Sequence, residues 1–170
     1  MRKGLIGRGG MKQLAALAAI ALTVGGCSSI DCPVQNIVSC VYQVSSNDSA
    51  NAYLPDTLSI TTLRADGTDS ILFNRGVGTS KLELPMSLTR AADTLLVERK
   101  GSSWRTLDTL YVEKQNHPRF ESIDCQLAYL HTITGVSHTR WGIDSVSINK
   151  TSVNYDASTP HLLLYFKRLR

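Results

Sequence analysis

Along most of the chain, apolar and polar residues alternate at every second position, a pattern that predicts half-buried β-strands. It is clearest at Thr57–Arg64 (TLSITTLR) and at Lys81–Pro85 (KLELP), where two leucines lie on one side of the strand. Further strands are predicted at Val34–Val44, Ser70–Asn74, Ile143–Ile148 and Leu162–Phe166. The polar segment Ser45–Pro55 predicts a loop before the strand at Thr57–Arg64. The pair Asp66-Gly67 predicts a tight turn after it.

A local repeat in the middle of the chain predicts a β-hairpin. Asp93–Lys100 (DTLLVERK) resembles Asp108–Lys114 (DTLYVEK), and the turn-forming residues Gly101–Ser103 lie between them. Trp104–Asp108 either extends the return strand or bends into it. The two copies are therefore expected to pair as neighbouring antiparallel strands.

After the repeat, Asn116-His117-Pro118 interrupts the pattern, and residues 119–134 predict one long strand that passes through Cys125. Gly135 then suggests a bulge or a turn. Nowhere does the mature chain show a sustained helical period. Eight or nine short strands separated by turn signals predict an all-β fold. The preferred architecture is an antiparallel β-sandwich, for which an immunoglobulin-like arrangement is one form. A closed barrel is the alternative to the sandwich.

The first 26 residues have a different pattern. Their charged residues are all basic, namely Arg2, Lys3, Arg8 and Lys12. The apolar run Leu14–Val24 has 11 residues, which suits a secretory signal and is shorter than the roughly 20 that a membrane-spanning helix needs. Met11 would also serve as a start, so the true N-terminus is either Met1 or Met11.

The signal ends in Val24-Gly25-Gly26-Cys27, which resembles a lipobox, the motif of bacterial lipoprotein signal peptides. Two small residues let a peptidase approach the backbone, and the thiol of Cys27 accepts the lipid. The alternative is that Cys27 is a structural thiol after an ordinary signal. One acyl chain binds membranes marginally, so stable anchoring through Cys27 requires several.

Removing the signal changes the charge of the protein. The whole chain has a formal net charge of +4, with 18 basic and 14 acidic residues. Four of the basic residues lie in the signal, so the mature chain is neutral and offers no basic face for nucleic acid. We expect a signal peptide at 1–26, a lipidated tether at 27–33 and a single domain at 34–170.

With Cys27 lipidated, three cysteines remain, an odd number that allows one disulfide bond and one free thiol. The tetrapeptide Ser-Ile-Asp-Cys occurs twice, ending at Cys32 and at Cys125. A bond between these two is the preferred pairing, and Cys40 with Cys125 is the alternative.

The histidines offer one candidate metal site. If Thr134-Gly135 is a two-residue turn, His131 and His138 face each other across a hairpin and could bind a metal ion with a carboxylate such as Asp124. The simpler interpretation is two hydrogen-bonded or exposed strand histidines, and it is favoured because the spacing matches no known ligand signature. No cofactor is expected.

Catalytic motifs are absent from the sequence. It has no Gly-rich phosphate loop, no nucleophile elbow and no zinc-binding His-Glu-x-x-His. A Cys–His pair, either Cys125 with His131 or Cys40 with His117, is conceivable, but disulfide formation is the commoner fate of thiols in the envelope. We therefore expect a protein without catalytic activity.

Six aspartates precede Ser or Thr and then an apolar residue. They are Asp48, Asp56, Asp69, Asp93, Asp108 and Asp144. The pattern resembles the acceptor motif for O-glycans on exported proteins of the Bacteroidota. For most of the six, the simpler interpretation is an aspartate that ends a turn before a strand begins. Ser49 and Thr57 are the candidate glycosylation sites, Ser49 first because its segment is the most loop-like.

Most of the mature chain resembles an uncharacterised family of small Bacteroidota lipoproteins, which is classified only as a domain of unknown function. The matching stretches are His117–Cys125 (HPRFESIDC), His131–Thr134, His138-Thr139, Ile143–Val146 and Val153–Asp156, with Asp31–Pro33 and Asp56–Leu58 nearer the front. The resemblance implies a lipid-anchored β-domain and supplies no functional residues.

These observations favour a lipid-anchored outer-membrane protein that contacts an envelope protein or a glycan. The single acid in Ser28–Asp31 favours the periplasmic face over the cell surface. One alternative is a metal- or ligand-binding module that uses His131 and His138. A less favoured alternative is an envelope hydrolase whose carboxylates come together only in the folded protein.

Overall fold

A computed structural model describes residues 37–46, 53–63, 67–120, 122–123 and 125–169. Residues 33–170 form one compact unit. The strands are β1 (Ser39–Ser46), β2 (Thr57–Leu63), β3 (Asp69–Gly76), β4 (Lys81–Pro85), β5 (Ala92–Lys100), β6 (Arg105–Arg119), β7 (Ala128–His138), β8 (Ile143–Ile148), β9 (Ser152–Val153) and β10 (Leu162–Phe166). The expected signal peptide at 1–26, the tether at 27–33 and the start of the expected first strand lie outside the described residues.

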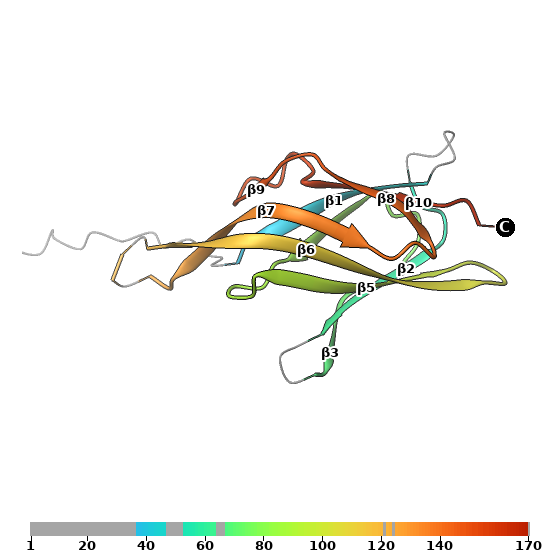
Figure 1. Ribbon diagram of the computed structural model, residues 1–170, viewed down its shortest axis with the longest axis horizontal. Coiled ribbons are helices and arrows are strands. Elements are labelled where there is room, and N and C mark those ends of the chain that lie inside the picture. The colour runs from blue at the N-terminus through green and yellow to red at the C-terminus, as the bar shows by residue number, and fades with distance from the viewer. Residues whose placement is uncertain (1–36, 47–52, 64–66, 121, 124, 170) are drawn as a thin grey trace, which may run out of the picture. The chain divides into compact units, whose positions relative to one another are not determined.

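The strands form two sheets (Figure 1). One sheet has the order β4-β1-β10-β8 and the other the order β3-β2-β5-β6-β7-β9. β1 pairs with β10 in parallel, and the other named pairs are antiparallel. The expected all-β sandwich is confirmed, with ten strands. Its strand order differs from that of the immunoglobulin fold, in which the second and third strands belong to different sheets.

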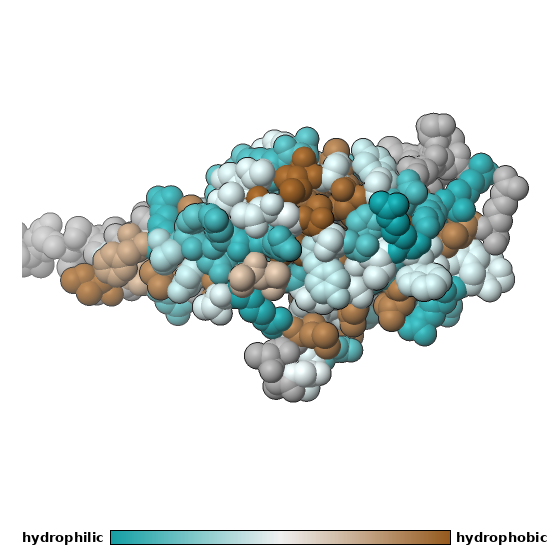
Figure 2. Space-filling model, in the orientation of Figure 1, coloured by the Kyte–Doolittle hydropathy of each residue, from teal (hydrophilic) through white to brown (hydrophobic). Residues whose placement is uncertain are grey.

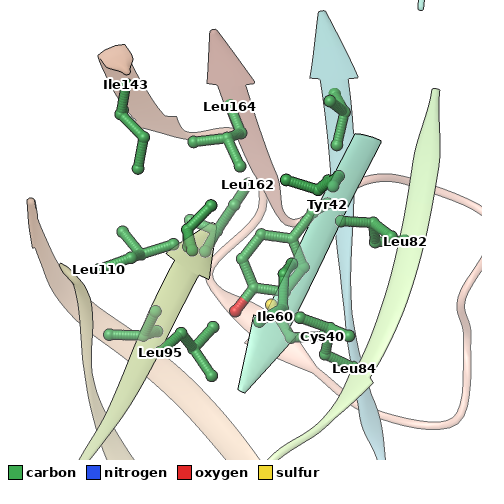
Figure 3. Packing of buried hydrophobic residues seen from close by; sticks show 14 of the residues in the cluster. Cys40, Tyr42, Ile60, Leu82, Leu84, Leu95, Leu110, Ile143, Leu162 and Leu164 are labelled. Carbon is green, nitrogen blue, oxygen red and sulfur yellow. The ribbon is translucent and has the colours of Figure 1, made fainter. Parts of the chain in front are cut away.

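The core lies between the two sheets. Figure 3 shows side chains from β1, β4 and β10 pointing toward those of β2, β5 and β6. Leucine, isoleucine and valine make up most of the core, and Tyr42 and Phe166 are its buried aromatic side chains. Within the part of the chain that the structure describes, no helix is long and apolar enough to cross a membrane.

Several strands lie where the sequence predicts them. β4, β8 and β10 have the predicted bounds, and the buried positions of β4 are its two leucines. The repeat forms a hairpin in which β5 and β6 pair from Ala92↔Glu113 to Lys100↔Arg105. Trp104–Asp108 thus mostly extends the return strand.

The region around residues 116–127 corrects two expectations. The expected break at Asn116-His117-Pro118 is wrong, because β6 continues through these residues to Arg119. The expected long strand at 119–134 is correct only from Ala128, where β7 begins, because β6 ends at Arg119. Pro118 is tolerated because the pairing of β5 with β6 ends at Glu113. The N–H group that proline lacks would therefore have had no partner on β5.

Gly135 marks a β-bulge. Of the two expectations for this residue, the bulge is confirmed and the turn is wrong. The register of β6 with β7 shifts between Glu113↔Gly135 and Lys114↔Ile133, so β7 carries one extra residue. A Cβ at Gly135 would lie 2.7 Å from Glu113 Oε2, the far end of an exposed side chain that can turn aside.

Candidate functional site

The repeated hairpin buries charged residues at both of its ends. The core-facing positions of β5 run from Asp93 to Arg99, and those of β6 from Asp108 to Lys114, with apolar residues between them. All four charged side chains are buried. Because the strands are antiparallel, Asp93 and Lys114 share one end of the hairpin and Arg99 and Asp108 share the other. The two ends lie roughly 20 Å apart along β5.

Lys114 organises the first of these ends, which we call the Lys114 end. Its ammonium group donates to the carbonyl oxygens of Ser87 (2.6 Å) and Arg90 (2.8 Å) and to Asn116 Oδ1 (2.6 Å). These three bonds use all of its donors. Burial lowers the pKa of Lys114, and the charge of Asp93 opposes that shift. The side chain therefore pins the loop between β4 and β5 onto the sandwich.

The same network fixes the proton on His131. Asn116 Nδ2 donates to the Arg90 carbonyl (2.9 Å), so Asn116 Oδ1 is the atom that faces both Lys114 and His131 Nδ1 (2.8 Å). Because that oxygen only accepts, Nδ1 of His131 carries the hydrogen. Burial, and then the charge of Lys114, lowers the pKa of His131 to about 4. Its Nε2 is thus a buried acceptor, with no hydrogen-bond partner in the described part of the chain.

Asp93 connects this end to the core. One of its oxygens accepts from the backbone N–H of Ser87 (3.2 Å). Its charge also acts on Cys40 and Tyr42, whose side chains point toward each other in Figure 3 and share a hydrogen bond. Burial raises the pKa of the Cys40 thiol to about 12. Cys40 is therefore a protonated, unreactive thiol at neutral pH.

A cavity of about 440 Å³ opens beside this polar cluster. Most of its wall is apolar, and its polar side chains include Ser87, Arg90 and Asp93. The hydroxyl of Ser87 is buried and has no partner among the residues that the structure places. Arg90 lies at the edge, where one guanidinium nitrogen donates to the Leu63 carbonyl (2.6 Å). A mostly apolar hollow with a few convergent polar groups is the usual form of a ligand site.

The opposite end of the hairpin, the Asp108 end, has closely matched polar groups. Asp108 accepts four hydrogen bonds, and they hold the loop between β7 and β8. Their donors are Thr139 Oγ1 (2.7 Å) and the backbone N–H groups of Trp141 (2.8 Å), Gly142 (2.6 Å) and Ile143 (3.0 Å). This carboxylate therefore fixes a loop between strands.

Arg99 completes the Asp108 end. It donates to Asp56 Oδ2 from two nitrogens (2.8 and 2.5 Å) and to the Lys167 carbonyl (2.6 Å). Its guanidinium also lies over the rings of Trp104 (4.8 Å) and Phe166 (5.4 Å). The ion pair and the two aromatic contacts tie β2, β5 and the end of β10 together.

The turn on which the candidate histidine metal site depended is not formed. Thr134 and Gly135 lie inside β7 and form no turn, so His131 and His138 are on one extended strand, roughly 23 Å apart. His138 bonds the Thr139 carbonyl through Nδ1 (2.8 Å). Among the described residues no group of three or more His, Cys, Asp or Glu could bind a metal ion. The candidate site depended on the turn at Gly135, and the structure has the bulge instead.

The cysteines are partly placed. Cys40 is free and buried in the core, so the alternative pairing of Cys40 with Cys125 is wrong. Of the two conceivable Cys–His pairs, Cys40 with His117 is wrong, because the Cys40 thiol lies in the core whereas His117 is exposed. Cys125 is not a free thiol. Its preferred partner, Cys32, and the lipidation candidate Cys27 lie outside the described residues.

Three of the six repeated aspartates have structural roles. Asp56 pairs with Arg99, Asp93 binds the loop before β5 and Asp108 holds the loop before β8. These contacts support the simpler interpretation of the motif. Of the two glycosylation candidates, Thr57 is half-buried at the start of β2, and Ser49 lies outside the described residues.

Sequence reasoning missed the polar groups of the Lys114 end. A signal was present, since Asp93 and Lys114 are in phase with the buried leucines and valines of the repeat. Alternation alone placed them on the core face. Ser87 and Arg90 belong to a loop, where no such periodicity exists.

Comparison with known proteins identifies one family. Residues 57–166 match the family model described as "Family of unknown function (DUF6452)". The match covers more than half of the chain, from β2 to the end of β10. No curated protein and no solved structure matches the chain.

Proposed function

The chain belongs to DUF6452, a family of unknown function, and from this premise we propose that it is a lipid-anchored envelope protein that acts as a non-catalytic binding module. The observation that carries the binding role is the cavity of about 440 Å³ at the Lys114 end. Its volume is within the range of small-molecule sites in proteins.

The anchor is supported by the sequence. A basic start, an apolar run and Gly25-Gly26-Cys27 are the layout of a lipoprotein signal. The proposed location is the outer membrane, on its periplasmic face, in a member of the Bacteroidota. A second proposal is the disulfide bond between Cys32 and Cys125. It is supported by the buried free thiol of Cys40, which leaves Cys32 and Cys125 as the available pair once Cys27 is lipidated.

Intact mass spectrometry of the protein from its native host tests these covalent proposals together. The expected mass is that of residues 27–170 plus a diacylglyceryl group and one further acyl chain, less the two hydrogens of a disulfide bond. A mass that begins at Met1 or Met11 with no lipid would overturn the anchor. A further increase in sugar-sized steps would locate glycans, which peptide mapping would assign to Ser49 or Thr57.

The charges beside the cavity favour an anionic ligand. Arg90 and Asp93 line the cavity with opposite charges. The cationic Lys114 lies behind this wall, where its ammonium binds the carbonyl oxygens of Ser87 and Arg90. These groups leave one net positive charge at the edge of a mostly apolar hollow. The proposed ligand is accordingly an apolar molecule with a single anionic group, which Arg90 can bind with the nitrogens that do not contact Leu63.

A fluorescent probe of this chemistry, 1-anilinonaphthalene-8-sulfonate, tests the site. We expect one probe molecule to bind per chain, and Arg90→Gln to weaken binding about tenfold, the effect of losing one charge-assisted contact. Leu88→Trp fills the cavity and is expected to abolish binding. Val77→Trp, on an exposed loop far from the cavity, is the matched control. Unchanged binding by the first two variants would exclude this cavity.

The buried cysteine and histidine of this part of the fold favour a binding role over catalysis, since neither lines the cavity. Cys40 holds its proton because its pKa is about 12, and His131 is turned toward Asn116. The competing hydrolase hypothesis is best represented by Asp69 and Glu98, which line a smaller cavity of about 200 Å³ on the outer face of the six-stranded sheet. Glu98 is already paired with Arg105 at 2.7 Å, which makes it a poor general acid or base.

A further inference from the structure

The end of the β6–β7 hairpin exposes a group of large apolar side chains. The last pair of the hairpin is Arg119↔Ala128, so Phe120 and Leu127 lie next to each other just beyond it. Their exposed fractions are 68% and 42%. Ile123 follows at the apex and is 90% exposed. Hydrophobic residues gather at this end of the hairpin in Figure 2. We call Phe120, Ile123 and Leu127 the apolar tip.

A backbone hydrogen bond closes a turn within the tip. The N–H of Cys125 donates to the Ser122 carbonyl at 3.2 Å, which closes a four-residue turn with Ile123 at its second position. Groups of exposed apolar side chains mark contact sites more often than isolated ones do.

The N-terminal chain reaches the domain at the same end. Ile37 forms a bridge with Tyr129, which belongs to the pair Pro118↔Tyr129, next to the last pair of the β6–β7 hairpin. Ile37 is itself 41% exposed. Nine residues lie between Cys27 and Ile37, so the chain between them spans at most about 36 Å. The proposed disulfide bond of Cys125 to Cys32 would leave four residues between Cys27 and the bonded cysteine, about 18 Å at most.

We propose that the apolar tip is a second membrane contact, which inserts Phe120, Ile123 and Leu127 into the bilayer that holds the lipid on Cys27. This inference rests on the proposed lipid anchor. The anchor brings the tip to the surface, and apolar side chains there gain from leaving water. Two contacts at one end would then orient the sandwich, with the Asp108 end pointing away from the membrane.

The charges near the tip indicate which lipids it contacts. Glu121 and Asp124 accompany Arg119 in this segment, so its net charge is negative. Anionic lipids would therefore add no attraction. The contact is hydrophobic, and we expect it on zwitterionic phosphatidylcholine and little dependence on salt.

The two native tryptophans give the experiment a built-in reference. Trp104 and Trp141 both lie at the Asp108 end, and Trp104 precedes β6, whose 15 residues span roughly 45 Å. In full-length lipidated protein on phosphatidylcholine vesicles, brominated acyl chains are expected to leave their fluorescence unchanged. Phe120→Trp adds a fluorophore at the tip, and its emission is expected to shift to the blue and to be quenched by the brominated chains.

Val77→Trp is the matched control. Val77 has the same exposed fraction as Phe120, 68%, and lies beyond Gly76, which aligns with the Arg99 end of the sheet. Its added emission is expected to be insensitive to the brominated lipid. Cys32→Ser lengthens the tether and is expected to reduce quenching of the Phe120→Trp variant.

Vesicle flotation separates the two proposals. Protein that carries no lipid on Cys27 and does not float contradicts the anchor. Protein that floats while the Phe120→Trp emission stays unquenched keeps the anchor and overturns the membrane-contact role of the tip. Quenching that is equal at Phe120→Trp and Val77→Trp overturns it as well. The emission of Phe120→Trp could also shift to the blue without quenching, and only when an envelope protein copurifies. That outcome assigns the tip to a protein partner and counts against the proposal.

Discussion

The Lys114 end and the Asp108 end derive from two copies of one sequence pattern, yet their polar groups are satisfied to different degrees. At the Asp108 end, four donors meet one carboxylate, and Arg99 has an ion partner and two aromatic rings. At the Lys114 end, Ser87 Oγ and His131 Nε2 have no partner within the described chain, and Ser87 lines a cavity of about 440 Å³.

This difference distinguishes charged residues that are buried to hold loops together from charged residues that are buried beside a candidate ligand site. A buried polar group without a partner carries a cost of about 1–3 kcal/mol, so a fold tends to retain one only where something compensates. Thr106 Oγ1 shows that the Asp108 end is also imperfect, but Thr106 lies against Gly142 and does not line the cavity of about 440 Å³. At the Lys114 end the unpaired hydroxyl of Ser87 belongs to the lining of that cavity, which is why we place the ligand there.

The largest expected effect is at the Asp108 end. Asp108→Ala leaves one hydroxyl and three backbone N–H groups without an acceptor, and we expect a loss of about 3–5 kcal/mol in the free energy of unfolding. Asp69→Ala is the control, because Asp69 begins the same tripeptide pattern but is exposed, and a change within about 0.5 kcal/mol is expected there. Urea denaturation measures both. Similar losses in the two variants would mean that the Asp108 bonds do not hold the loop.

The next effect is at the Lys114 end. Lys114→Met keeps the aliphatic stem but removes three hydrogen bonds and the charge that balances Asp93. We expect a loss of about 2–3 kcal/mol in urea denaturation together with a loss of probe binding, because the loop that walls the cavity is released. Lys100→Met, at an exposed position of β5, leaves both quantities unchanged. If Lys114→Met retained the affinity for the probe, the loop that Lys114 holds would not be needed for the binding site.

The sequence predicted the hairpin better than it predicted the role of its two ends. Alternation and the repeat located β5 and most of β6, since both signals are local. Whether a charge at a core-facing position finds partners depends on loops from distant parts of the chain, such as residues 86–91 and 139–142. No local pattern reports those contacts. The bulge at Gly135 misled for the same reason, since a glycine alone does not distinguish a bulge from a turn.

Acid is expected to weaken the Lys114 end selectively. The pKa of His131 is lowered from 6.5 to about 4 in the folded protein, so the unfolded chain binds more protons between these values. Stability is therefore full above pH 6.5 and falls as the pH drops toward 4, by at most about 1.4 kcal/mol per pH unit from this group. Lys114, Asp93 and His117 are the charged or titratable groups that act on it.

His131→Phe tests this assignment, because it removes the titrating group and makes the pH dependence of unfolding shallower. His161 is also buried with a lowered pKa, so part of the slope remains. The control is His138→Phe on the same strand, which is expected to keep the slope of the unmodified protein. A slope that is unaffected by His131→Phe would place the acid sensitivity elsewhere.

The smallest effect has the opposite sign and bears most directly on the comparison. Ser87→Ala removes a buried hydroxyl that has no partner in the described structure but keeps the backbone N–H that binds Asp93. We expect the free energy of unfolding to rise by about 0.5–1 kcal/mol, because a desolvation cost disappears. Ser103→Ala, at an exposed loop position, is expected to change nothing. If the hydroxyl also contributes to the ligand site, Ser87→Ala lowers the affinity for the probe in addition to raising the stability. A variant that is both less stable and unchanged in probe affinity would show that Ser87 is structural, and the distinction between the two ends would then rest on the cavity alone.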